Sequence, residues 1–462
     1  MALFHRKKKK ETNNNNEFFQ AKSKSKFQQF KDTVFSRHYK IERFGIGFSV
    51  LSLAIIMCLL VSLKNYTDYV NNTVASQSLY GTQFTTSKTG IDGQVTGIYA
   101  NKDRTKSFVL WKVSDYSSLP SDPKKYQFFM AAQDGRGNYQ PVSGKPAAVF
   151  YLFGQTGYAG LMLINSQGFS KQILNIVCRI NGQIVPSDDN NSGNMDQGMF
   201  AKYDQFRLKV NPGANKIKTL KSLDSKREPS VADLYSEMIL NKNEKNIRKQ
   251  LKKDVSNLAV DLNNIHDREL RLRDYDGLQV PKLPKYIAGD KVVEKNGTQY
   301  FVTKQTIPGG VDFDWQDATV QEGEIDALKK KYKMDPSLTS DEFLSDLAEK
   351  RKDNQTSENL SSKISNSTWR YKNGKKADLQ DGDGGGSDDG DSNDNDESSV
   401  VSKTKQINND IQDFTSSIDN YNTDKQNYQT VDLIKWLNLE ATYRRINNFS
   451  AVNDSSNLLK IY

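Results

Sequence analysis

The longest apolar stretch of the chain runs from Phe44 to Leu63, carries no charge, and lies between Arg43 and Lys64. At a helical rise of about 1.5 Å per residue it spans roughly 30 Å, which matches the hydrocarbon core of a bilayer. No other run in the sequence approaches this length. The pattern therefore predicts one transmembrane helix over residues 44–63, with the membrane-anchor residues Phe44, Leu51, Ile55, Leu59 and Leu63.

Beyond this helix the apolar pattern changes to that of short strands. Residues 64–89 are polar without apolar periodicity, which predicts a stalk. From residue 90 to residue 213, runs rich in β-branched and aromatic residues alternate with turn sequences such as Asn211-Pro212-Gly213. The series is typical of an all-β sandwich-like domain. The runs 147–153 and 161–164 are apolar on both faces, so we expect them to form its central hairpin around a glycine-containing turn.

Two later segments, 214–280 and 400–462, repeat apolar residues at alternating spacings of four and three, the seam of a coiled coil. The first begins with Ser230 as N-cap and Asp233 in a capping-box arrangement. Because a heptad helix in water must bury its seam, the seams pair with each other, with a second copy or with another protein. The predicted oligomer-seam residues are Leu251, Val255, Leu258, Leu262, Ile265, Ile407, Ile411, Phe414, Ile418 and Tyr421.

Between the two heptad segments, residues 281–352 predict a small α+β module. Asn296-Gly297 is a strong hairpin signal, and Thr339 with Glu342 marks the capped start of a short helix. Residues 353–399 predict an acidic disordered linker, because the part from 378 to 397 is rich in aspartate and glycine and holds no base. No frame in it supplies the full ligand set of an EF-hand, so a solvated linker is favoured over a calcium site.

The formal net charge of +9 points to a nucleic-acid binder only until its distribution is considered. The basic arm 1–43 holds twelve Lys or Arg and four acids, so it carries eight of the nine net positive charges. By the positive-inside rule, the arm predicts a cytoplasmic N-terminus and an extracytoplasmic C-terminal region. Its length argues against a cleavable signal peptide. Its charge suits anionic lipid headgroups, and we expect nucleic acid, if at all, only at this arm.

Candidate chemistry beyond the predicted helix is sparse. Cys58 lies in the apolar run and Cys178 in a predicted strand, so the ectodomain has no intramolecular disulfide, which fits a Gram-positive surface. His266 stands beside charged residues at a helix end, where a solvated histidine is favoured over a catalytic one. One His and one Cys are too few for the usual zinc ligands. We therefore expect no enzyme activity, no cofactor and no metal.

Three pieces between residues 95 and 214 resemble a known group of proteins. The plan of basic arm, single helix, β domain and coiled-coil helices is similar to that of single-pass envelope accessory proteins from Gram-positive conjugative plasmids and related mobile elements. The resemblance implies a place in the cell envelope and supplies no catalytic or ligand residue. The pieces are Gly97-Ile98-Tyr99-Ala100-Asn101, Phe153-Gly154-Gln155-Thr156-Gly157-Tyr158 and Asn211-Pro212-Gly213-Ala214.

The sequence thus predicts a membrane-anchored multidomain protein with one N-terminal transmembrane helix, an all-β sandwich-like ectodomain, a small α+β module and C-terminal coiled-coil helices. We expect a bitopic structural or assembly subunit of a cell-envelope complex in the cell membrane, with a conjugative transfer or secretion apparatus favoured. Its expected partners are the lipid bilayer, other envelope-complex proteins and further subunits of a homo- or hetero-oligomer. The alternative is a cell-wall-binding surface module that uses exposed aromatic residues of the β domain, followed by an envelope hydrolase.

Overall fold

The computed structural model describes residues 29, 31, 40–68, 72, 76–134, 137–180, 203–352, 364, 367–377, 394–448 and 458–461. They fall into two compact units, Met1–Val74 and Ala75–Tyr462. The first unit contains the helix α2 (Lys40–Asp68). Its part from Phe44 to Asp68 is long and apolar enough to cross a membrane, and none of it is buried in the chain. The helix predicted over residues 44–63 is therefore confirmed as a helix.

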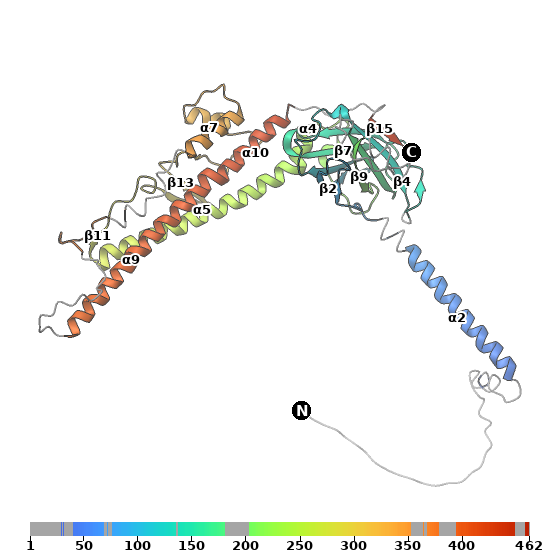
Figure 1. The fold of residues 1–462 in the computed structure, drawn as a ribbon, viewed down its shortest axis with the longest axis horizontal. Helices are drawn as coiled ribbons and strands as arrows, with labels where there is room; N and C mark the ends of the chain where they lie inside the picture. Colours follow the sequence, from blue (N-terminus) through green and yellow to red (C-terminus); the bar gives the residue numbers. More distant parts are fainter. Residues whose placement is uncertain are drawn as a thin grey trace, which may run out of the picture. The chain divides into compact units, whose positions relative to one another are not determined.

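The second unit begins with two β-sheets packed face to face (Figure 1). The first sheet has the strand order β1-β2-β3-β7-β6, and β10 pairs in parallel with β2. The second sheet has the order β15-β4-β8-β9, and β5 pairs with β4. The strands are β1 (Gln83–Thr85), β2 (Asp92–Ala100), β3 (Lys106–Val113), β4 (Tyr126–Gln133), β5 (Tyr139–Gln140), β6 (Ala147–Leu152), β7 (Tyr158–Ile164), β8 (Ile173–Ile180), β9 (Asp204–Val210), β10 (Lys218–Thr219) and β15 (Leu459–Ile461).

The last strand, β15, comes from the C-terminal end of the chain and pairs in parallel with β4. Leu458, just before it, is buried in the core between the two sheets. The sandwich is therefore completed by residues that lie outside the predicted β domain 90–213. The predicted C-terminal helical segment 400–462 correspondingly ends as a strand.

The first sheet is covered on both faces. In β3, Val109 and Trp111 point into the sandwich core, whereas Phe108 and Leu110 belong to the cluster formed with the helices. A Cβ at Gly160 would lie 2.1 Å from the Phe108 ring, so this position in β7 requires glycine. Two-sided burial explains the fully apolar run 147–153. Its strand β6 lies at the edge of the sheet, however, and only β7 of the expected central hairpin is central.

Two long, continuous helices follow (Figure 1). Their contacts run in opposite order, from Arg271–Asp410 at one end to Arg248–Trp436 at the other, so the helices are antiparallel. We call the pair the helical hairpin. In the second helix a π-helical segment, residues 427–432, joins two α-helical parts into one continuous helix. The helical segments are α4 (Val231–Tyr235), η5 (Ser236–Leu240), α5 (Asn241–Leu270), η6 (Arg271–Tyr275), α9 (Asp394–Gln426), η8 (Asn427–Asp432) and α10 (Leu433–Ile446).

Local sequence signals explain how these elements begin and turn. The Ser230 hydroxyl accepts from the Asp233 N–H, and the Asp233 carboxylate accepts from the Ser230 N–H, so the predicted capping box at α4 is present. Asn296 and Gly297 both have positive φ, 51° and 74°, as a type I′ hairpin turn requires. The elements between the two long helices are β11 (Leu278–Gln279), β12 (Lys291–Lys295), β13 (Thr298–Val302), α6 (Ile325–Lys331), α7 (Ser340–Lys352) and β14 (Arg370–Tyr371). Four of them, from β12 to α7, belong to the module predicted over residues 281–352.

Two predicted boundaries are wrong in part. The stalk predicted over 64–89 contains β1, where Phe84 is buried and its ring stacks on that of Phe206 at 4.2 Å. The disordered linker predicted over 353–399 contains β14, which pairs with β11, and Trp369, which is buried. In both places short polar segments surround a large aromatic residue that is buried. The acidic residues 378–393 lie outside the described residues.

Candidate functional site

The predicted membrane-anchor residues lie along α2 and are exposed. Their side chains are exposed by between 53% for Ile55 and 84% for Phe44. The helix also contains Cys58, which is exposed as well. The complete set is Phe44, Leu51, Ile55, Leu59 and Leu63.

The predicted seam residues are brought together inside one chain. Leu251, Val255, Leu258 and Ile265 of α5 are buried in the same cluster as the seam of α9, and Leu262 packs against that cluster. The seam residues of α9 are Ile407, Ile411, Phe414, Ile418 and Tyr421, all of which are buried. The first of the three pairing alternatives therefore accounts for both seams. Oligomerisation stays a prediction.

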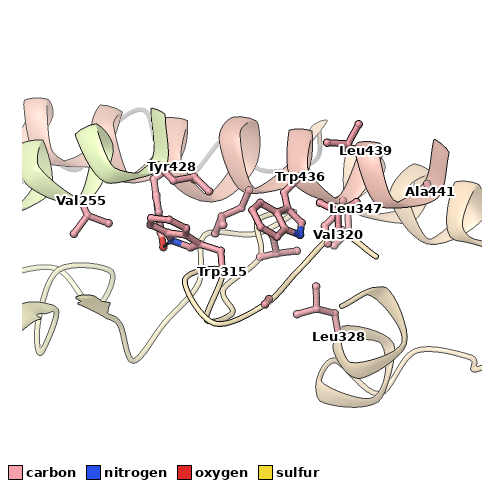
Figure 2. Packing of buried hydrophobic residues seen from close by; sticks show 14 of the residues in the cluster. Val255, Trp315, Val320, Leu328, Leu347, Tyr428, Trp436, Leu439 and Ala441 are labelled. Carbon is pink, nitrogen blue, oxygen red and sulfur yellow. Dashed lines mark hydrogen bonds between the residues drawn. The ribbon is translucent and has the colours of Figure 1, made fainter. Parts of the chain in front are cut away.

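Near the sandwich, Arg248 of α5 ties three segments together. Its guanidinium stacks over the buried Trp436 ring at 4.6 Å and forms an ion pair with Glu244 at 2.8 Å. It also donates to the backbone oxygens of Trp315, at 2.7 Å, and Ala318. Figure 2 shows Trp436 directed from α10 towards the segment that contains Val320. This end of the hairpin is therefore fixed by an aromatic core and a fully used arginine.

Farther along, Lys425 of α9 forms a buried ion pair with Asp290, and each side chain is only 1% exposed. The Lys425 ammonium also donates to Thr303 Oγ1 at 3.1 Å and to the Gln305 oxygen at 2.9 Å. The Asp290 carboxylate accepts in addition from the Tyr421 hydroxyl at 2.6 Å. We call this group the Lys425 cluster. It fastens the segment carrying β12 and β13 onto α9.

Burial lowers the pKa of Lys425, while the hydrogen bond and charge of Asp290 oppose this effect. For Lys425, the unfavourable effect of removing the ammonium from water is therefore larger than the favourable effect of the ion pair with Asp290, as is common for buried ion pairs. Sequence reasoning missed both residues. One signal was available, because Lys425 occupies the next position of the heptad seam after Tyr421, where an apolar residue is normal.

A pocket of about 310 Å³ opens beside the Lys425 cluster. Aromatic side chains form much of its wall, and Trp315 Nε1 donates to the Tyr428 hydroxyl at 3.0 Å, an arrangement visible in Figure 2. Its polar groups include Lys295, Asp312 and Gln316. A mixed apolar and polar lining of this size is typical of small-ligand sites. The aromatic lining residues are Tyr300, Phe301, Phe313, Trp315 and Tyr428.

Asp312 gives this pocket its main electrostatic feature. Burial raises the pKa of its carboxyl, and the nearby Lys331 ammonium, at 3.6 Å, works in the opposite direction. The Asp312 N–H donates to the Tyr332 hydroxyl at 3.1 Å, which fixes the start of this loop. The pocket wall therefore contains an acid, Asp312, beside a cation, Lys331.

A second opening, of about 500 Å³, lies at the edge of the sandwich and is lined by β1, β2 and β3. Its lining includes Thr85 and Asp92, whose side chains already hydrogen-bond each other at 2.7 Å. Lys112 is the lining cation. The Asp92 carboxylate in this groove thus already accepts a hydrogen bond from within the chain.

The remaining candidate groups stay apart. Cys178 is fully buried in β8, and burial, reinforced by Asp204, raises the pKa of its thiol, which disfavours the reactive thiolate. His266 is exposed on α5. Among the described residues, no group of three or more His, Cys, Asp and Glu side chains is placed to hold a metal ion.

The candidate functional features are thus an uncovered apolar helix, a self-paired helical hairpin and an aromatic pocket beside it. Comparison of the chain with protein-family models, with curated proteins and with solved structures finds no match.

Proposed function

We propose that the chain is a single-pass membrane subunit that helps to assemble a cell-envelope complex, with a conjugative transfer or secretion apparatus as the favoured machine. In this proposal α2 crosses the cell membrane, the basic arm is cytoplasmic, and the unit from Ala75 onward is extracytoplasmic. The chain contributes position and contact surface, and the proposal assigns it no reaction of its own.

The observation that carries the proposal is the uncovered apolar surface of α2. Apolar side chains run from Phe44 to Leu63 without a charge, and none of this window is buried. Burying one Leu or Ile side chain is worth about 1.5–3 kcal/mol, so water is a costly environment for the whole run. A bilayer covers such a surface completely, and the basic arm fits the anionic cytoplasmic leaflet.

The helical hairpin supports an assembly role. The 30 residues of α5 correspond to roughly 45 Å of helix at about 1.5 Å per residue. Leu234 and Tyr235 of α4, at the start of the helical hairpin, share a cluster with Phe108 and Tyr151 of the first sheet. The hairpin is therefore joined to the sandwich through a continuous core, and its outward faces are available for neighbours.

Site-specific photo-crosslinking in intact cells tests the proposal. A photoreactive residue at Val260, which is 55% exposed on α5, should form adducts with other envelope proteins. The matched control carries the same residue in an L51K/L59K chain, which should lose both the membrane position and the adducts. Recovery of the wild-type chain as an isolated monomer, with no adducts under irradiation, contradicts the proposal.

A second candidate function, binding of a wall polymer, is favoured by the aromatic pocket. In the sandwich most aromatic rings are buried, and Tyr116 and Tyr139 are the exposed large ones among its described residues. The pocket therefore offers a better site than the β domain, since Tyr300 and Asp312 supply a ring and an acceptor. Full-length chain should sediment with purified cell walls, and Y300A should reduce this. Equal sedimentation of both proteins contradicts the pocket as the site.

A further inference from the structure

Three pairs of aspartates face each other across the helical hairpin. In each pair the two carboxyl groups lie within hydrogen-bond reach, one from the helix of α5 and η6 and one from the helix of α9 and η8. We call them the carboxyl pairs. They are Asp254–Asp432, Asp261–Asp424 and Asp276–Asp410.

The pairs follow from the heptad pattern. Asp254 and Asp261 each precede a seam residue of α5, and Asp410 and Asp424 take the equivalent position in α9. Coiled coils normally place residues of opposite charge at these flanking positions. Here acid faces acid, at sites where repulsion between carboxylates would push the helices apart.

The π-helical segments η6 and η8 extend the pattern. Steps of seven from Asp261 and Asp424 lead to residues 275 and 431, each one short of an aspartate. A π-helical turn holds one residue more than an α-helical turn. Segments η6 and η8 therefore bring Asp276 and Asp432 onto the same face as the other acids.

One oxygen of each pair lacks a donor. The Oδ2 atoms of Asp254, Asp261 and Asp276 are buried and accept no hydrogen bond from the described residues. Asp254 and Asp276 are only 6% and 5% exposed as whole residues. A buried carboxylate oxygen that faces a second carboxylate is costly unless a proton lies between them.

The groups around the first pair leave its charge only partly compensated. The Gln250 amide donates to the other oxygen of Asp254 at 2.8 Å, and Lys435 forms an ion pair with Asp432 at 2.7 Å. Asp424 adds further negative charge to Asp254. The Tyr428 phenol also interacts electrostatically with Asp254.

The other two pairs have similar surroundings. Asp261 faces Asp424, and the Tyr421 phenol interacts with it. The neighbouring Lys425 is already paired with Asp290.

In the third pair, Arg271 neutralises Asp410 at 2.9 Å, and Lys403 interacts with Asp276. In the first and third pairs one acid thus has a cation of its own, and the other faces that acid from the opposite helix.

We propose that each carboxyl pair holds one shared proton, so that the helical hairpin is closed in mildly acidic medium and loosens as the medium becomes alkaline. This inference concerns the hairpin itself and is independent of the proposed function.

Burial and the facing charges raise the affinity of these acids for protons. Burial, then Asp432, raises the pKa of Asp254 to about 7, and burial, then Asp424, raises that of Asp261 to about 6. Burial also raises the pKa of Asp276. Because these values lie above the ordinary 3.8, the folded chain binds more protons than the unfolded chain. The stabilisation is complete below about pH 4 and is lost as the pH rises through about 6 to 7.

The test compares the full-length chain in detergent micelles with the variant D254N/D261N/D276N, in which each amide donates permanently to the facing carboxylate. Hydrogen exchange of α5 and α9 peptides and Tm are measured from about pH 5 to about pH 8 in chelator. Between about pH 5 and about pH 8 the wild type should lose hydrogen-exchange protection in both helices, and its Tm should fall by at least about 5 °C. The variant should change by less than half as much.

D419N, at an exposed position of α9, is the matched control and should keep the wild-type profile. His266 and other titrating groups are retained in all three proteins, so they cancel in the comparison. Should the triple variant not fold, D254N alone should remove part of the pH dependence.

Parallel profiles for the wild type and the carboxyl-pair variant would overturn the proposal, and so would equal flattening by D419N. A second series contains about 1 mM calcium. Stabilisation at about pH 8 by calcium, absent from the variant, would assign the pairs to a metal ion and also overturn the shared proton.

Discussion

Replacement of Lys425 by methionine removes the ammonium group that neutralises the buried carboxylate of Asp290. Methionine approximates the shape of the lysine stem, so the helix α9 and its packing are kept. Asp290 would keep the hydroxyl donors Tyr421 and Thr303 but lose its cation. The carbonyl of Gln305 would lose a donor at 2.9 Å.

The expected cost follows from burial. Both side chains are 1% exposed. Removing one partner of a buried ion pair lowers the free energy of unfolding by about 3–5 kcal/mol, because the other charge is left uncompensated. D290N should cost a similar amount. In the double variant K425M/D290N neither charge of the pair remains. Its loss of unfolding free energy should therefore be smaller than the sum of the losses of the two single variants, by up to about 3 kcal/mol.

The assay is urea unfolding of the full-length chain in micelles, followed by helical circular dichroism. Y421F is the matched control, because it removes one donor to Asp290 and leaves the ion pair in place, at a cost of about 1.5–3 kcal/mol. A K425M loss below about 1 kcal/mol, or strictly additive single losses, would refute the claim that this ion pair fastens the β12–β13 segment.

Three other expectations concern α2 and the two cores. Lysines at Leu51 and Leu59 cost about 2.5–3.5 kcal/mol each at the centre of a membrane helix, so carbonate should extract L51K/L59K but not the wild type; equal retention contradicts a spanning α2. W436A empties a fully buried site and should lower the free energy of unfolding in urea by about 3–5 kcal/mol, and a loss below about 1 kcal/mol would contradict its core position. Because burial raises the pKa of the Cys178 thiol, maleimide should modify it in a C58S chain only after unfolding, so labelling of the folded chain is the contrary result.

Structural features that depend only on residues close together in the sequence were predictable. The Asn296-Gly297 turn needs two positive φ angles, and the Ser230 capping box needs two side chains three residues apart. The heptads of α5 and α9 likewise require only a regular spacing of apolar residues. Each of these signals acts within a few residues, so no knowledge of distant partners is needed.

Features that depend on distant partners were not predictable. Strand β15 is only three residues long and exists as a strand because β4 offers an edge. Lys425 meets Asp290 only after the β12–β13 segment packs on α9. The carboxyl pairs also needed the register between the two helices and the extra residues of η6 and η8. A local pattern carries no information about which of three partners a seam will choose.

Among the features of the candidate site, the two seams were found and the aromatic pocket was missed. The pocket combines Tyr300 from a hairpin, Trp315 from a loop and Tyr428 from a π-helical segment, which are far apart in the sequence. No spacing rule connects such residues. Tyr428 falls three residues after Lys425 and so keeps the heptad spacing, but that spacing does not show that a loop and a hairpin pack beside it.

The central claim, a single-pass subunit with its large unit outside the membrane, is tested most directly by cysteine accessibility in intact cells. The C58S chain receives one new cysteine, either S25C in the basic arm or S121C at an exposed position of the sandwich unit. With a membrane-impermeant maleimide, S121C should be labelled in intact cells, and S25C should be labelled only after the membrane is permeabilised. Labelling of S25C in intact cells, with S121C protected until permeabilisation, would contradict the account.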